Sequence, residues 1–333
     1  FLRVAGDEFV AVELGQALSR HCPQIGSWRI YDAKEASAVS SDIVIVLWPD
    51  YPRLRQSAAK KVMWLQNGGW ASRIPMLQEQ FDVLFCASRL LCERVPEMVY
   101  LPVACTNPTL YRPCPSHPRF EAEVCFLGNY YREGRSGEHA ARYMLPVTEF
   151  RFAIWGSGWD AADPPMLRRF YRGRLPITLG PVVHSSCQVF LSYHDLRHRQ
   201  DDMPSGRVFD ALACEAFVLS DHMPSLEALF SRYVVFTTGG EDLREKVRYF
   251  LAHPEERVAK VQGARSFILT HHTNTHRAKQ IAHHLGLTWG EDVSGDHRIE
   301  RAPVDGPASA RFPGVRAGVH GLGEDVSLVR GQG

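Results

Sequence analysis

The sequence predicts an α/β protein with two domains, each built on a parallel, doubly wound sheet. Short apolar segments, typical of buried parallel strands, alternate with segments whose apolar residues recur at helical spacing. Both halves of the chain repeat this alternation, and a proline-rich stretch separates them. The 333 residues, 45% of them hydrophobic, are enough to fill two cores of ordinary size.

In the first half, we expect strands and helices to alternate from the first residue. Expected strands are 1–6, 28–31, 42–48, 61–66, 81–87 and 99–101, and expected helices are 9–21 and 88–94. Several of these strands are apolar throughout, as strands covered on both faces are. The chain opens on Phe1 rather than on methionine, so we expect it to begin inside its first strand.

A linker is expected where prolines gather. Pro102, Pro108 and Pro113 limit regular structure, because proline lacks a backbone N–H and fixes its own φ angle. Two further prolines extend the break, so we place a domain boundary near residue 118. The predicted organisation is a first domain at 1–118, a second domain at 119–287 and a tail at 288–333.

The second half repeats the pattern. Expected strands are 123–127, 150–155, 177–180, 185–191, 216–220 and 233–236. Expected helices are 136–143, 239–253, 254–270 and 273–285, with two more that begin near residues 206 and 224. From residue 288 the apolar periodicity is lost and Gly, Asp, Arg and Pro prevail, which predicts a tail that is disordered or loosely attached.

Composition excludes several classes of function. A formal net charge of +1 gives no basic field, so nucleic acid is not an expected partner, and no apolar run reaches the roughly 20 residues of a membrane span. The eight cysteines form no C-x-x-C pair, so neither zinc nor a redox motif is predicted, and a reducing, cytoplasmic compartment is expected. His272 and His276 lack a third ligand, so no metal and no cofactor are predicted.

Residues 203–221 read as a loop, a helix and a strand, and they carry the main candidate site. Gly206 lets the backbone approach a ligand, and a helix that begins near Ser205 or Gly206 points N–H groups at an anion. Arg207 adds a fork of donors suited to phosphate. Asp210, one turn further on, can accept from sugar hydroxyls. Alternatively, Arg207 and Asp210 pair with each other on an exposed helix face.

Further candidates follow the ends of expected strands, where open α/β sheets bind ligands. In the second domain these are Gly128 and Asn129 after strand 123–127, and Gly156 in a turn that could admit the nucleobase of a nucleotide. His194 begins a polar run at 194–202, which is expected to be a mobile loop over the ligand or simply a solvated one. Arg132 and Arg135 are expected to be solvated loop charges.

The segment RVFDALACEAFVLSD, residues 207–221, resembles the signature segment of the group 1 glycosyltransferases, and most closely their CgeB-like branch. The proline-rich linker also resembles that family, and so do the glycines that follow two expected strands, Gly128 and Gly156. The resemblance implies a GT-B fold, a last helix that returns to the first domain, and a nucleotide-sugar donor linked through UDP, GDP or dTDP. Asp202 and Asp210 keep the spacing of two acidic residues in related enzymes, whereas Glu215 replaces the usual Gly.

These observations predict a metal-independent glycosyltransferase. The helix N-terminus at Ser205 and Gly206, with Arg207, would stabilise the leaving diphosphate, and Asp210 would fix the ribose. Candidate catalytic residues are Arg207, Asp202 and Asp50. Asp50 follows a strand of the first domain and could serve as the base of an inverting transfer, although the resemblance favours retention. The acceptor is not identified by the sequence.

Two other functions remain open. One is a non-catalytic GT-B module that binds a nucleotide sugar or a partner protein, an idea to which Glu215 and the aspartates in place of glutamates give weight. The other is a sugar-nucleotide epimerase of the same fold, which would need an acidic pair poised against C2 of the sugar.

Overall fold

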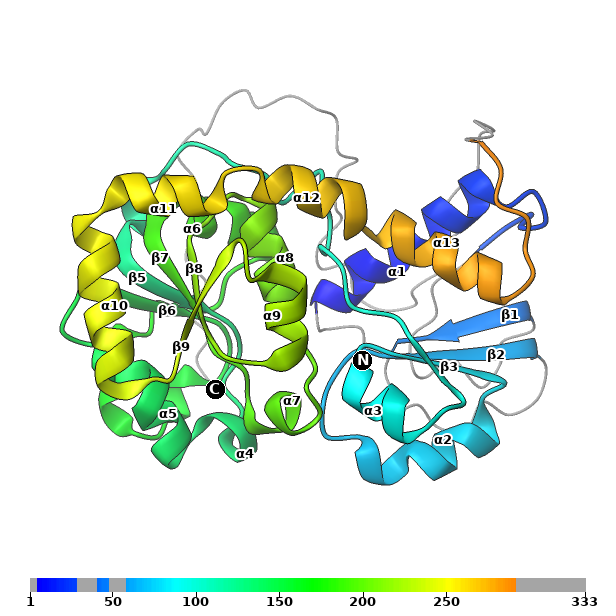
Figure 1. Ribbon diagram of the computed structural model, residues 1–333, viewed down its shortest axis with the longest axis horizontal. Helices are drawn as coiled ribbons and strands as arrows, with labels where there is room; N and C mark the ends of the chain where they lie inside the picture. Colours follow the sequence, from blue (N-terminus) through cyan, green and yellow to red (C-terminus); the bar gives the residue numbers. More distant parts are fainter. Residues whose placement is uncertain (1–4, 29–40, 48–57, 292–333) are drawn as a thin grey trace, which may run out of the picture. The chain divides into compact units, whose positions relative to one another are not determined.

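A computed structural model describes residues 5–28, 41–47 and 58–291 (Figure 1). Within these ranges the chain forms two separate parallel sheets, as predicted. The strand expected at 1–6 is wrong for Ala5 and Gly6, which begin helix α1 (Ala5–His21). The other residues of that strand lie outside the described ranges. So do Asp50, residues 29–31 of a second expected strand, and the tail beyond residue 291.

The first sheet has the strand order β1-β2-β3-β4, with every neighbouring pair parallel. Its strands are β1 (Ser41–Val46), β2 (Ala58–Leu65), β3 (Val83–Cys86) and β4 (Met98–Tyr100). Helices α2 (Ile74–Gln80) and α3 (Arg89–Arg94) connect them, and α3 begins at Ser88, whose hydroxyl accepts from Leu91 N–H.

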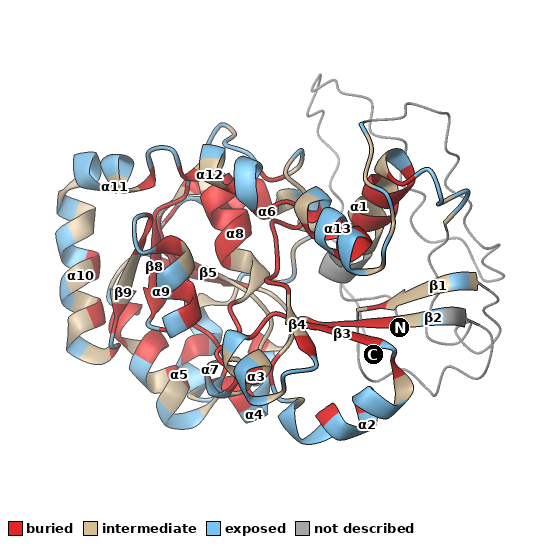
Figure 2. Cartoon of the chain, turned by 45° about the vertical axis from the view of Figure 1, so that its right-hand side comes forward, coloured by how far each residue is buried: buried red, intermediate tan, exposed pale blue. Residues whose placement is uncertain are grey.

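The last described helix, α13 (Asn274–His284), packs against this first sheet, as the family resemblance implied. Its Ala278 and Ile281 share a buried cluster with Leu14 of α1 and Phe85 of β3. Figures 1 and 2 both show α13 beside α1. The helix begins where it does because Thr273 and His276 form a reciprocal capping box.

The second sheet has the strand order β6-β5-β7-β8-β9, again all parallel. Its strands are β5 (Ala122–Leu127), β6 (Phe152–Trp155), β7 (Cys187–Ser192), β8 (Val218–Asp221) and β9 (Val234–Thr237). Numbered along the chain, this order is 2-1-3-4-5. The strand order therefore reverses between β5 and β7, and open α/β sheets bind ligands beyond the carboxyl ends at such a point.

The helices of this half pack on the sheet or against one another, and their buried faces are red in Figure 2. They are α4 (Arg132–Arg135), α5 (Gly137–Met144), α6 (Gly180–Ser186), α7 (Leu196–Gln200), α8 (Gly206–Ala213), α9 (Pro224–Phe230), α10 (Gly240–Ala252), α11 (Pro254–Val261) and α12 (Ala264–His271). Helix α8 packs against β7 and β8, and α10 packs against β7 and β9. Val208 and Leu212 of α8 are fully buried, so this helix is held rigidly by the core.

Three further expectations of secondary structure are wrong. Residues 177–180 form a 3₁₀ turn that runs into α6 rather than a strand, because Pro181 suits the first turn of a helix. The polar run at 194–202 contains α7, which Asp195 caps by accepting from two N–H groups. The helix expected at 254–270 is two helices, since Gly263 adopts φ +80° between them.

Glu215, at the position where the related family usually has Gly, has the backbone geometry that Gly favours. Glu215 adopts φ +55°, just after α8 ends. The N–H of Ala216 donates to Ala211 O and the N–H of Glu215 donates to Leu212 O, both at 3.0 Å. These two bonds form a Schellman motif, whose left-handed residue is usually Gly. The turn is therefore intact, with backbone strain at Glu215.

We expect Glu215→Gly to raise the free energy of unfolding by about 1 kcal/mol, because glycine avoids the left-handed penalty of an L-residue. Urea unfolding of the parent and the variant measures this difference. Glu215→Ala is the matched control, since it removes the carboxylate but keeps the Cβ atom and should gain little. Equal gains for Gly and Ala would mean that backbone strain is not the cause.

Candidate functional site

Gly128 and Gly156, which follow β5 and β6, are so tightly packed that neither position has room for a side chain. A Cβ atom on Gly156 would collide with Gly128 O, and a Cβ atom on Gly128 would collide with the guanidinium of Arg207. Asn129 holds the turn after β6, because its Oδ1 accepts from Ser157 N–H at 2.9 Å. The structure thus brings Gly128, Asn129, Gly156 and Arg207 together.

Arg207 lies at the reversal of strand order between β5 and β7. Its guanidinium donates to Leu127 O at 3.2 Å, to Tyr193 O at 3.3 Å and to Ser205 Oγ at 3.1 Å. These bonds use three of the five N–H donors of the group, and two remain available. Burial, with nearby Arg135 as the next cause, lowers the pKa of Arg207 to about 9, so the group is still charged at neutral pH.

Arg135 is a second cation at the reversal of strand order. The expectation that its side chain is solvated is wrong. Its side chain is only 4% exposed and its Nη1 donates to Tyr193 O at 2.9 Å. Arg135 and Arg207 both lie over the ring of Phe126, at 5.2 and 5.0 Å. Its position just after a strand end could have indicated a ligand site. The general preference of arginine for the surface was given more weight.

In the described part of the chain no carboxylate lies within ion-pair distance of these two cations, although Asp195 and Asp221 are near enough to interact with them electrostatically. Among the described residues neither Arg135 nor Arg207 forms an ion pair, and Arg135 Nε is buried without a hydrogen-bond acceptor. Two neighbouring buried charges of the same sign are unfavourable unless an anion joins them. The point of strand reversal is therefore electrostatically prepared for an anionic ligand.

His194 is fully buried and connects β8 to the loop before α8. Its Nδ1–H donates to Asp221 Oδ1 at 2.8 Å, and its Nε2 accepts from Ser205 N–H at 3.0 Å. Because Nε2 accepts, the proton resides on Nδ1 and the ring is neutral in this arrangement. His194 thus positions Ser205 at the start of α8.

Asp221 is a functional candidate that the sequence analysis left without a role. It ends β8, and its Oδ2 accepts from Arg199 at 2.6 Å. Burial alone would raise the pKa of Asp221, but His194 and Arg199 hold it below its ordinary value. The carboxylate is therefore ionised at neutral pH and fixes both partners.

The N-terminus of α8 has one N–H group that remains available. Ser205 caps the helix by accepting from Arg207 N–H, whereas the N–H of Gly206 has no acceptor among the described residues. A Cβ atom on Gly206 would meet only Ala104 O, at 3.8 Å. A free N–H at a helix N-terminus attracts negative charge.

Asp210 does not pair with Arg207, the alternative that its spacing suggested. Its two carboxylate oxygens accept from Thr106 N–H at 2.7 Å and from Thr106 Oγ–H at 2.9 Å. This contact ties α8 to the proline-rich linker. Burial raises the pKa of Asp210 to about 7, and the bonds from Thr106 act against that rise.

The other predicted catalytic residues lie elsewhere. Asp202 accepts from the N–H and hydroxyl of Ser225, so its carboxylate sits at the N-terminus of α9. Asp202 also adopts φ +47°, a left-handed conformation that Asp tolerates better than most residues. Asp50 lies outside the described residues.

Two features are absent from the described part of the chain. No group of three or more His, Cys, Asp or Glu side chains is placed to hold a metal ion. No helix in that part is long and apolar enough to cross a bilayer.

Comparisons with known proteins agree with this geometry. Residues 135–283, which include Arg135, His194, Arg207 and Asp221, match the model of a family described as glycosyl transferase-like. No curated protein matches the chain in sequence.

Solved structures share the fold at low sequence identity. Sucrose-phosphate synthase from Thermosynechococcus elongatus has a TM-score of 0.52 and 12% identity, with 70% of this chain and 69% of that chain covered. Anabaena HepE in complex with UDP and glucose has a TM-score of 0.53 and 12% identity, covering 68% and 71%. A TarM variant from S. aureus in complex with Fondaparinux, alpha-GlcNAc-glycerol and UDP has a TM-score of 0.51 and 9% identity, covering 67% and 50%.

The predicted fold, two parallel α/β domains of the GT-B type, is confirmed by these neighbours. The family match and the shared fold together support a glycosyltransferase.

Proposed function

We propose that this protein transfers a sugar from a nucleotide-diphosphate donor held beyond the carboxyl ends of β5 and β7. The observation that carries the proposal is the pair of cations Arg135 and Arg207, which share the acceptor Tyr193 O and have no carboxylate partner among the described residues. A diphosphate would supply an anion that both guanidiniums contact directly. UDP is the proposed nucleotide, because HepE and TarM were solved with UDP.

The transfer step follows from where charge develops. As the bond between the sugar and the diphosphate breaks, negative charge grows on the leaving diphosphate. The two free N–H donors of Arg207, the Gly206 N–H and the charge of Arg135 would stabilise it without a metal ion. His194 and Asp221 would act indirectly, by fixing Ser205 at the start of α8.

The remaining assignments are proposals drawn from the sequence. Asp210 would fix the donor ribose through the acceptor sites that Thr106 leaves free, since a carboxylate has about four. Asp202 would act on the donor sugar only if it released Ser225, to which three hydrogen bonds now hold it. The CgeB-like branch remains the proposed subtype, and the acceptor is undetermined.

Binding of UDP tests the proposal most directly. A ligand that binds only the folded state stabilises it by about 2.7 kcal/mol at a hundredfold excess over its Kd, so UDP should raise the melting temperature in a concentration-dependent way. Chelation of divalent ions should leave this shift unchanged. Uridine, which lacks the diphosphate, is the control and should give a much smaller shift. Equal shifts with uridine and UDP would contradict a diphosphate site.

Incubation with UDP-sugars then separates the three candidate functions. A glycosyltransferase releases UDP, either by transfer or by slow hydrolysis of the donor. An epimerase changes the sugar, and a binding module leaves the donor intact. Release of UDP that ceases when Arg207 is replaced would favour the transferase over both alternatives.

A further inference from the structure

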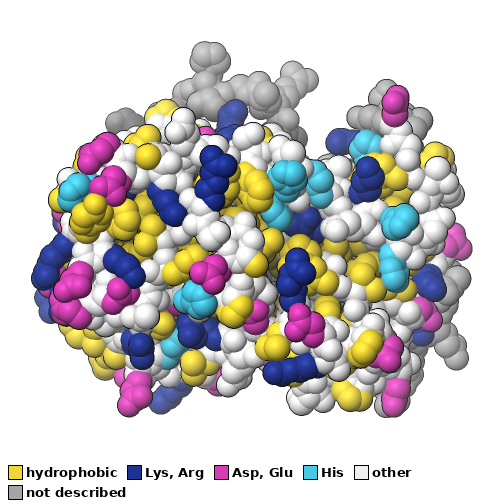
Figure 3. Space-filling model, in the orientation of Figure 1, with side chains coloured by type: hydrophobic (Ala, Val, Ile, Leu, Met, Phe, Trp, Pro, Cys, Tyr) yellow, Lys and Arg dark blue, Asp and Glu magenta, His cyan; other side chains and the backbone are white. Residues whose placement is uncertain are grey.

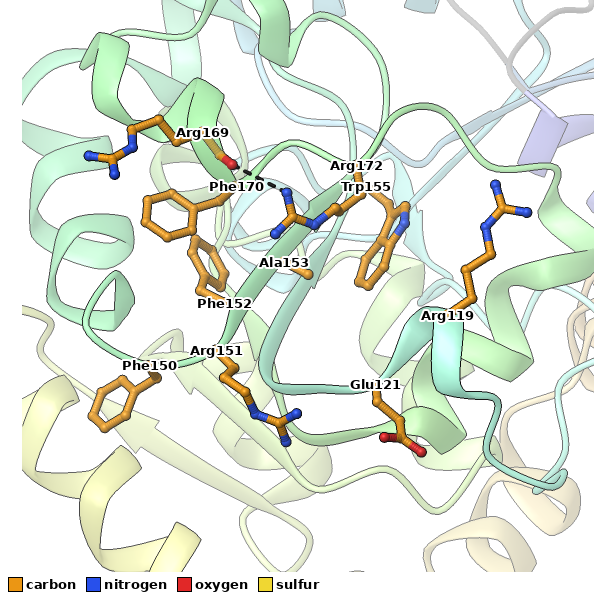
Figure 4. Close-up of a pocket in the computed structure, with 10 residues that line it drawn as sticks. All are labelled: Arg119, Glu121, Phe150, Arg151, Phe152, Ala153, Trp155, Arg169, Phe170 and Arg172. Carbon is orange, nitrogen blue, oxygen red and sulfur yellow. Dashed lines mark hydrogen bonds between the residues drawn. The ribbon is translucent and has the colours of Figure 1, made fainter. Parts of the chain in front are cut away.

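The outer edge of the second sheet carries a cavity that the proposed donor site does not use. Strand β6 is one of the two edge strands, and the cavity of about 430 Å³ lies along it (Figure 4). The 3₁₀ turn at Pro165–Phe170 and the residues that precede β5 complete its lining. This volume falls in the range of small-ligand sites. None of Arg135, Gly128 and Arg207 contributes to it.

Positive charge is concentrated in this cavity. Four of its ten lining residues are arginines, Arg119, Arg151, Arg169 and Arg172, and one is a glutamate, so the lining carries a formal charge of +3. The whole chain carries only +1. On the face drawn in Figure 3, by contrast, basic and acidic side chains are interspersed. The cavity is therefore a local basic site on a nearly neutral protein.

Two of these guanidiniums form no hydrogen bond or ion pair with the described residues. Among the described residues, neither Arg119 nor Arg169 has a hydrogen-bond acceptor or an ion-pair partner for its guanidinium. Arg151 lies 3.8 Å from a carboxylate oxygen of Glu123, and Arg172 donates one bond to Arg169 O at 3.2 Å. Most of the donor capacity of the four groups remains available to a ligand.

Aromatic rings line the cavity between the arginines. Phe152 and Trp155 lie on either side of Ala153, whose small side chain leaves space at the floor (Figure 4). Phe170 packs on Phe152 with ring centroids 5.5 Å apart. Phe152 and Trp155 are only 3% exposed, so the rings that can meet the C–H face of a sugar are those of Phe150 and Phe170, which are partly exposed. The guanidiniums suit the carboxylates or sulfates that the sugar bears.

We propose that this cavity binds an acidic oligosaccharide, a glycan chain whose sugars carry carboxylate or sulfate groups. The four guanidiniums lie apart and do not converge on one point (Figure 4), which fits several separated anions rather than one phosphate. The choice of a carbohydrate rests on the proposed transferase function. Such a site would hold part of an acceptor chain away from the point of transfer. Nucleic acid fits less well, because the chain as a whole carries a formal net charge of only +1.

Calorimetry on the full chain with tetragalacturonate tests the proposal. Each exposed charge pair is worth a small free energy, so Arg169→Gln should weaken binding about two- to fivefold, and Arg119→Gln with Arg169→Gln about tenfold. Arg174→Gln is the matched control, an exposed arginine of the same loop that does not line the cavity. Because all three side chains are exposed, the variants should fold like the parent, and their melting temperatures check this.

Three further probes define the ligand class. The methyl ester of tetragalacturonate has the same rings without charge and should bind at least tenfold more weakly. Tripolyphosphate has charge without rings and should also bind more weakly, and equal or tighter binding would overturn the role of the aromatic rings. A single-stranded oligonucleotide that binds more tightly than tetragalacturonate, through the same arginines, would overturn the carbohydrate assignment.

The donor site serves as the internal reference. UDP should raise the melting temperature of the Arg119 and Arg169 variants as much as that of the parent. If UDP binds and tetragalacturonate does not, this inference fails and the proposed function stands. If tetragalacturonate binds through these arginines and UDP does not bind, the cavity assignment stands and the proposed function fails.

Discussion

Replacing Arg207 by methionine should lower turnover by about 100-fold or more, with a smaller change in donor affinity. The expected size is that of losing one donor aimed at developing negative charge. Methionine keeps much of the volume of the side chain while it removes the charge and every N–H. Steady-state rates of UDP release, measured over a range of donor concentrations, separate the effect on turnover from the effect on binding.

The controls for this prediction address folding and geometry. Loss of Arg207 leaves Leu127 O without one donor, whereas Tyr193 O keeps the bond from Arg135, so the variant should fold with modest destabilisation. Arg207→Lys keeps the positive charge but loses the planar fork of N–H donors. The turnover of this variant should lie between those of the parent and Arg207→Met. Arg174→Met should have no effect. Unchanged turnover in folded Arg207→Met would remove this residue from the mechanism.

The second large effect concerns Asp210. Its pKa rises from an ordinary value of 3.8 to about 7 in the folded protein, chiefly through burial. The folded state therefore holds a proton that the unfolded chain releases between about pH 4 and pH 7. The free energy of unfolding contributed by Asp210 falls as pH rises through this window. At 1.36 kcal/mol per pKa unit, the loss amounts to about 4 kcal/mol above pH 7.

Asp210→Asn should abolish this fall, because an amide does not ionise. The Asn Oδ1 atom can still accept from Thr106 N–H, and its Nδ2–H can donate to Thr106 Oγ. At pH 8 the variant should be more stable than the parent by up to about 4 kcal/mol, and at pH 4 the two should be similar. Urea unfolding of the parent and the variant at both pH values measures the difference. Because all other groups are the same in the two proteins, their titration cancels. Parallel pH profiles would contradict the assignment.

The same variant tests the ribose proposal. If Asp210 accepts from the donor ribose, Asp210→Asn should bind UDP more weakly by calorimetry while gaining stability at pH 8. Unchanged affinity, together with the stability gain, would leave Asp210 as the residue that ties α8 to the linker through Thr106 and nothing more.

Local patterns were sufficient to predict most elements of the second sheet. The apolar runs that became β5, β6 and β8 were recognised as strands, and the start of α8 was placed at Ser205 or Gly206, where the structure has it. These features depend on periodicity, turn residues and capping, which act over a few residues. The sequence also determined which residues follow strand ends, and hence the region where a ligand is expected.

Only the tertiary structure decided which of those residues meet. It brought Arg135 against Arg207 although 72 positions separate them, it attached Asp210 to Thr106, and it placed Asp202 on the N-terminus of α9. Strand order decides such contacts, and strand order depends on how whole helices and strands pack, not on the residues beside each position. The sequence by itself therefore determined the kind of fold and the segment that carries the site. The charge balance of that site, two cations without a described carboxylate partner, emerged only when distant strand ends were packed together.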